Sequence, residues 1–126
     1  RFAPGRTRIY SDHSFAGVVL DLVGFQRPAL QRSEDTFVQI GKERIPEMDA
    51  DRIFYFAPDD DNAESMANLG EWLNDPLFLR LDATEAGKAT RVRELSWNLG
   101  GGIYSAYMML DEIADIYDVT LPAQAD

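Results

Sequence analysis

The order of helical and strand segments in the second half of the chain limits the fold more than any other feature. From residue 42 onward, helical patterns alternate with short apolar runs. Helices are predicted over Lys42–Met48, around a face of Met66, Leu69 and Leu73, and over 103–117, and strands over 52–56 and 90–95. Strands separated by helices pair in parallel through right-handed crossovers. We therefore expect an α/β domain: a three-layer, open, mostly parallel sheet with helices on both faces.

The first third of the chain has a different pattern. Pro4-Gly5 is a turn signal between 1–3 and 8–10, which predicts a strand and hairpin arm over residues 1–13. Apolar residues over 15–23 then recur at helical spacing, with Asp12 or Ser14 as the N-cap and Gly24 at the C-terminal end. Residues 26–39 are polar and predict a long loop. We expect residues 14–117 to form the α/β lobe and 118–126 a tail.

Composition excludes several classes of protein. With 126 residues the chain is about one domain. It has no cysteine, so a disulfide scaffold and a thiolate metal site are excluded. A net charge of −10 argues against a nucleic-acid partner, whose phosphates require a basic face. The chain has no apolar run of the roughly 18 residues that a membrane span needs. Its abrupt start suggests a fragment of a longer protein.

Charge is unevenly distributed along the sequence. Residues 1–33 carry five arginines and two aspartates, a net +3, which leaves −13 for the remainder. Residues 43–75 contain ten acids and two bases. A solvated face explains such a run, and the alternative is an acidic docking surface for a basic partner. The arginine-bearing segment also has two interpretations: solvent-exposed charge or a binding site for an anion.

Three motifs suggest chemistry, and each has a simpler explanation. His13 has serines and an aspartate beside it, but sequence neighbours rarely converge as a catalytic triad. The aspartates at 59–61 lack the spacing of a calcium loop, and helix capping, with Asp61 and Glu64 as a capping box, explains them. The glycines at 100–102 lack both phosphate-loop frames. Trp97, predicted in the loop before them, is either a core anchor or an aromatic platform for a ligand.

Four stretches occur in a characteristic order: residues 10–28 (Tyr-Ser-Asp-His-Ser-Phe-Ala-Gly, ending Gly-Phe-Gln-Arg-Pro), 40–54 (Ile-Gly-Lys-Glu-Arg-Ile-Pro-Glu), 75–83 (beginning Asp-Pro-Leu) and 97–112. Together they resemble the C-terminal lobe of the siderophore-binding proteins of iron-uptake ABC transporters, of the ferric-dicitrate and ferrichrome type. Such proteins are clamshells of two α/β lobes joined by a long helix, with the ligand between the lobes. The resemblance implies one lobe over residues 1–126, with the first lobe and a lipidated leader outside this chain.

The resemblance also implies a function and partners. We expect an extracytoplasmic, lipid-anchored substrate-binding component that delivers an iron(III)-siderophore complex to an ABC-transporter permease. No catalytic activity, no protein-bound cofactor and no protein metal ligands are expected, because a ferric siderophore is already a complete chelate. Membrane association is expected only through an anchor outside this chain.

The resemblance also implies roles for individual residues. Those expected at the ligand are Trp97, Tyr10, Arg8, Phe37, Thr36 and Arg1. The family's Ser-x-Glu helix docks to arginines of the permease, and Glu43 occupies the place of that glutamate, with Gly41 instead of the serine.

Two other functions remain open at the level of sequence. The first is a haem or cobalamin binder of the same clamshell class, in which Tyr10 or His13 would have to ligate haem iron. The second is a small α/β signalling or enzyme domain with an acid pocket at its strand ends, for which Asp59–Asp61 are the candidates.

Overall fold

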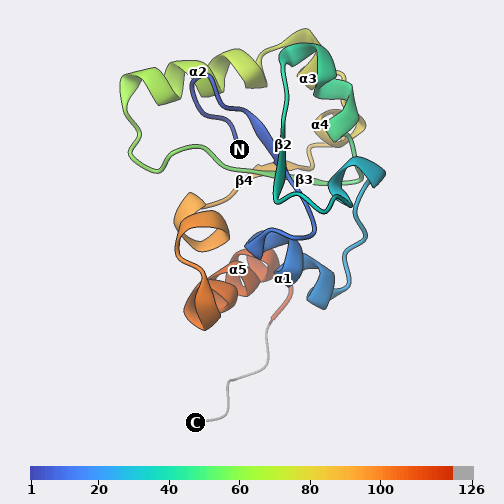
Figure 1. Cartoon of the computed structure of the whole chain (residues 1–126), viewed down its shortest axis with the longest axis vertical. Coiled ribbons are helices and arrows are strands. Elements are labelled where there is room, and N and C mark those ends of the chain that lie inside the picture. The colour runs from blue at the N-terminus through green and yellow to red at the C-terminus, as the bar shows by residue number, and fades with distance from the viewer. Residues whose placement is uncertain (121–126) are drawn as a thin grey trace.

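The computed structural model describes residues 1–120. Of the predicted tail, residues 121–126 lie outside this range. The elements along the chain are β1 (Arg8–Tyr10), α1 (Phe15–Val23), η1 (Ala29–Gln31), β2 (Phe37–Gln39), η2 (Lys42–Met48), β3 (Ile53–Tyr55), α2 (Ala63–Leu73), α3 (Pro76–Leu79), α4 (Asp82–Glu85), β4 (Ala89–Arg91), η3 (Leu95–Leu99) and α5 (Gly102–Ile116). Figure 1 shows the strands between two groups of helices, α2–α4 on one side and α1 with α5 on the other. The three-layer α/β architecture is confirmed.

The strands form two short ladders. β3 and β4 pair in parallel, with Phe54 opposite Thr90, whereas β1 and β2 pair antiparallel, with Ile9 opposite Val38. The parallel pair is the one that the helix–strand alternation predicts. The antiparallel pair was not expected, because β2 lies within the segment predicted to be a loop and returns directly alongside β1.

Residues 1–3 connect the two ladders. The amide of Phe2 donates to the carbonyl of Phe56 over 2.9 Å, and the main chains of Arg1 and Arg8 exchange hydrogen bonds of 2.8 and 3.0 Å. The predicted pairing of 1–3 with 8–10 across the Pro4-Gly5 turn is therefore present. It is not a projecting arm, because Phe2 and Ile9 are buried in the core.

Each face of the strands has its own apolar core. On the α2–α4 side the buried residues include Phe2, Ile9, Ile40, Ile45, Met48, Leu69, Trp72, Phe78 and Leu81. On the α1 and α5 side they include Val19, Leu20, Phe56, Val92, Trp97, Met109 and Ile113. Neighbouring residues of one strand point to opposite faces, which is how β1 and β3 contribute to both cores.

Capping residues set the ends of the longer helices. Ser14 caps α1 by accepting from Gly17 N over 3.0 Å, and Gly24 ends the helix with φ of 106°, as predicted. The predicted capping box before α2 is wrong: Asn62 is the N-cap, and its Oδ1 accepts from Ser65 N over 2.8 Å. Asp61 instead has a φ of 50° and faces Arg91.

Two other predicted elements differ from those observed. The strand predicted over 90–95 ends at Arg91, because the carboxylate of Asp59 accepts from the amides of Glu94 and Leu95 and starts the π-helical turn η3 there. The predicted helix over 42–48 has the expected bounds but is a 3₁₀ helix.

Candidate functional site

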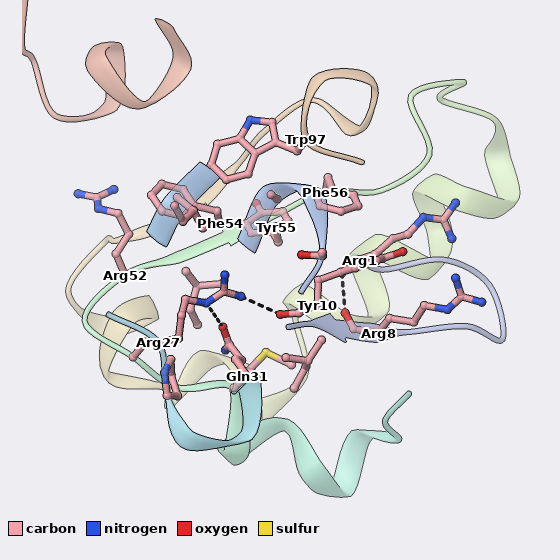
Figure 2. A pocket seen from close by; sticks show the side chains of 18 of the residues that line it. Arg1, Arg8, Tyr10, Arg27, Gln31, Arg52, Phe54, Tyr55, Phe56 and Trp97 are labelled. Atoms are coloured by element: carbon pink, nitrogen blue, oxygen red, sulfur yellow. Dashed lines mark hydrogen bonds between the residues drawn. The ribbon is translucent and has the colours of Figure 1, made fainter. Parts of the chain in front are cut away.

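A cavity of about 180 Å³ lies where the start of the chain, β1, β3, η1 and η3 meet. Its walls combine aromatic rings with four arginines, and Asp51 is the only acid among the lining residues. The aromatic residues are Phe2, Tyr10, Phe25, Phe54, Tyr55, Phe56 and Trp97, and the arginines are Arg1, Arg8, Arg27 and Arg52. Figure 2 shows most of these side chains around the hollow. A cationic, aromatic cavity is suited to a bulky anion with flat apolar surfaces.

Arg27 is held rigidly in the wall of the cavity. Its Nε donates to Gln31 Oε1 over 2.9 Å, and its Nη2 donates to the main-chain carbonyl of Tyr10 over 2.7 Å (Figure 2). The third nitrogen, Nη1, is buried and has no hydrogen-bond partner. Burial lowers the pKa of this guanidinium, which Asp12 only partly offsets, but the group stays charged at neutral pH. A desolvated cation that makes no salt bridge within residues 1–120 favours an anionic ligand.

Two further polar atoms in the lining lack partners. Thr7 Oγ1 and Arg8 Nε are buried without a hydrogen bond, so three of the five unpartnered buried side-chain atoms within residues 1–120 border this one cavity. The Arg8 guanidinium also stacks on the Phe37 ring, 4.0 Å from its centroid. Buried donors without partners cost free energy unless a ligand or water satisfies them.

The other two arginines of the cavity have partners inside the protein. Arg1 makes an ion pair with Glu94, whose side chain is 4% exposed. Arg52 lies over the Tyr117 ring at 4.7 Å and donates to Thr90 Oγ1 over 3.3 Å. Their charge is therefore shared with the protein, whereas Arg8 and Arg27 make no salt bridge among residues 1–120 and each has a buried nitrogen without a partner.

Trp97 forms part of the apolar wall. It lies in η3 rather than in the loop expected from the sequence, is 2% exposed and contacts the Phe54 ring at 5.0 Å between centroids. Its indole Nε1 donates to the Glu112 carboxylate on α5. The two interpretations of Trp97, core anchor and ligand wall, are therefore compatible, because it packs in the core and borders the cavity.

Four of the six residues predicted at the ligand line the cavity: Arg1, Arg8, Tyr10 and Trp97. Phe37 lies just behind them, its ring 5.8 Å from that of Tyr10, and does not line it. Thr36 is exposed, and its carbonyl accepts from Ser11 N. The structure adds Arg27, Gln31 and Arg52, which the sequence reasoning missed. The only sequence signal for Arg27 is its place in the Gly-Phe-Gln-Arg-Pro stretch.

Glu43 lies away from the cavity, in the first turn of η2, and is exposed. Nearby Glu47 makes a salt bridge of 2.5 Å with Arg44, which lowers the pKa of the Glu47 carboxyl. Glu43 makes no salt bridge among the residues that the structure describes. Its carboxylate folds over Gly41, where an added Cβ would collide with Glu43 Oε2.

The remaining motifs have structural roles. His13 is exposed, with Nδ1 2.6 Å from the Ser33 carbonyl, and does not line the cavity. Asp59 caps η3, and Asp60 accepts from Asn62. Within residues 1–120, no group of three or more His, Asp or Glu side chains is arranged to hold a metal ion. No helix in the same range is long and apolar enough to cross a membrane.

Comparison with known proteins identifies relatives of this chain. YfiY of Bacillus subtilis, a probable siderophore-binding lipoprotein, is 41% identical over 123 residues, covering 90% of this chain and 37% of YfiY. The achromobactin-binding periplasmic protein of Dickeya dadantii is 33% identical over 111 residues, covering 86% of this chain and 36% of that protein. No protein-family model matches the chain.

Two solved structures of SirA share the fold of this chain. Staphylococcus aureus SirA superposes with a TM-score of 0.85 at 27% identity, over 95% of this chain and 47% of SirA. SirA complexed with staphyloferrin B superposes with a TM-score of 0.81 at 28% identity, over 94% of this chain and 44% of SirA. The homologues of this chain are thus siderophore-binding proteins, and the chain corresponds to a C-terminal portion of them. It spans a little over a third of the length of YfiY and of the Dickeya protein.

Proposed function

We propose that this chain is the C-terminal lobe of an extracytoplasmic siderophore-binding protein that supplies an iron-uptake ABC transporter. The lobe contributes one wall of a groove, and a second lobe contributes the other. The ligand is an iron(III)-siderophore complex, and the protein binds it without catalysing a reaction. The names of the relatives, a lipoprotein and a periplasmic protein, support a location outside the cytoplasm with a lipid anchor.

The observation that carries this proposal is the partnerless nitrogen of Arg27. Gln31 and Tyr10 hold the guanidinium in place, so that Nη1 is ready to donate without further ordering of the side chain. Arginine forms its strongest hydrogen bonds with carboxylate and similar oxyanions. A ferric chelate that retains negatively charged oxygens would meet this requirement, and the aromatic wall would cover its organic part.

The size of the cavity limits what this lobe can hold by itself. A volume of about 180 Å³ is below the roughly 300–1,000 Å³ of ligand pockets in general. A whole siderophore complex therefore needs the groove between two lobes, and we expect the isolated chain to bind it weakly. The aromatic and cationic groups on this side would contact one portion of the ligand.

We further propose that Glu43 docks the loaded protein to the permease. Glu43 is exposed, makes no salt bridge within residues 1–120 and lies outside the ligand cavity. A carboxylate in that state is available to a basic partner, since complementary charge guides association between surfaces.

A fluorescence titration of the full-length protein tests the proposed function. Ferric complexes of a carboxylate, a catecholate and a hydroxamate siderophore are added in turn, and tryptophan emission is recorded. Quenching by at least one complex is expected, with a weaker response in Trp97→Ala. The absence of a response to all three complexes would overturn the proposal.

A further inference from the structure

The wall residue Trp97 is held in place from outside the cavity. Its indole N–H donates to Glu112, which lies on α5 and does not line the cavity. Glu112 instead borders a separate hollow, together with Asp59, Asp61, Arg91, Arg93 and Asp115. The two hollows share no lining residue. The Trp97–Glu112 hydrogen bond therefore connects the ligand cavity to a different surface of the lobe.

Glu112 also contacts two neighbours of Trp97: Ser96 in the π-helical turn and Arg93 just before it. Besides the indole, its carboxylate lies 3.4 Å from Ser96 Oγ and 3.5 Å from Arg93 N. Asp59 holds the start of the same turn by accepting from the amides of Glu94 and Leu95, over 3.1 and 2.9 Å. Short π-helical turns are uncommon and frequent at functional sites. Here two carboxylates from outside the turn fix its geometry.

The far end of the turn is closely packed as well. A Cβ on Gly100 would collide with Ser105 Oγ and lie 3.0 Å from the Leu95 carbonyl. The C-terminal end of η3 therefore packs closely against Ser105 of α5. The orientation of the Trp97 ring then depends on the partner of its N–H, because a buried indole N–H without an acceptor is costly and the ring would turn or shift to find one.

We infer that Glu112 is a positioning residue for ligand binding: it holds the Trp97 ring as a fixed wall of the cavity and so sets ligand affinity without touching the ligand. This inference rests on the proposed function. It predicts that the contribution of Glu112 to affinity passes through the indole N–H. Phenylalanine at position 97 keeps an aromatic wall but has no donor, so it separates the two contributions.

A double-mutant cycle in the full-length protein tests the inference. Affinity for the ferric siderophore that binds best is measured in the wild type, Glu112→Leu, Trp97→Phe and the double variant. Glu112→Leu should weaken binding on the order of tenfold, as expected for loss of a hydrogen bond to a charged group. It should have no further effect in the Trp97→Phe background. Equal losses in both backgrounds would mean a merely structural role and overturn the inference.

Two further variants serve as controls for the double-mutant cycle. Glu112→Gln keeps an oxygen acceptor and should restore affinity to within about threefold of the wild type, whereas a loss as large as that of Glu112→Leu contradicts the inference. Glu112→Ala repeats the cycle without adding an apolar side chain, in case Glu112→Leu does not fold.

Tryptophan fluorescence of the same variants without ligand tests this inference separately from the proposed function. The emission of Trp97 without ligand is obtained by subtracting the emission spectrum of the matching Trp97→Phe variant from that of each protein that retains Trp97. Glu112→Leu should shift its maximum and increase its quenching by acrylamide. If no ferric siderophore binds the wild type, the proposed function fails and the effect on affinity fails with it, whereas the ligand-free readout still tests whether Glu112 holds the Trp97 ring. An unchanged Trp97 emission would overturn the inference.

Discussion

The guanidinium of Arg27 donates to the main-chain carbonyl of Tyr10 over 2.7 Å, and this bond ties the segment after α1 to the end of β1. It also fixes the orientation of a cavity arginine that makes no salt bridge within residues 1–120 and has one buried nitrogen without a partner.

Arg27→Met should weaken binding of an anionic ferric siderophore by about tenfold to a hundredfold, because charge-assisted hydrogen bonds contribute about 1.5–3 kcal/mol. Isothermal titration calorimetry on the full-length protein measures the effect. Arg6→Gln is the matched control, since Arg6 is exposed and does not line the cavity. Equal losses in the two variants would show that only the overall positive charge matters.

Glu43→Ala should abolish siderophore-dependent iron uptake by cells while leaving ligand affinity unchanged, because Glu43 is outside the cavity. Glu47→Ala is the control on the same short helix, since its carboxylate is already paired with Arg44. Uptake of radioactive iron and calorimetry report the two properties separately. Loss of ligand affinity in Glu43→Ala would place this residue in the binding site instead of the docking surface.

Asn62→Ala should destabilise the chain by about 1 kcal/mol, because Asn62 Oδ1 satisfies the Ser65 amide at the start of α2. Asp61→Gly should change stability by no more than a few tenths of a kcal/mol, because glycine suits a φ of 50° and the exposed salt bridge with Arg91 contributes little. Urea unfolding compares the two variants. A larger loss of stability in Asp61→Gly than in Asn62→Ala would identify Asp61 as the N-cap of α2 instead.

Local signals predicted the helices better than the strands. α1 matches its predicted bounds because apolar spacing, Ser14 and Gly24 all specify the same segment. β2 was not predicted, because its three residues lie in a polar segment and their hydrogen bonds come from β1, a distant partner. The end of β4 depends in the same way on Asp59, which reaches η3 from another part of the chain.

The candidate site was only partly predictable for the same reason. Of the six residues that the resemblance selected, Arg1, Arg8, Tyr10 and Trp97 line the cavity, and Phe37 and Thr36 do not. Sequence alone could not distinguish Arg27 from the other arginines of the first segment, because its importance comes from the burial of one nitrogen and from its contact with Tyr10. The role of Glu112 similarly requires the packing of α5 against η3.

A crystal structure of the full-length protein with its ferric siderophore would test the central claim most directly. The account predicts a ligand between two lobes, with an anionic oxygen within hydrogen-bonding distance of Arg27 Nη1 and its organic part against Trp97. A ligand bound elsewhere, with Arg27 Nη1 still unpartnered and the aromatic cavity empty, would contradict it.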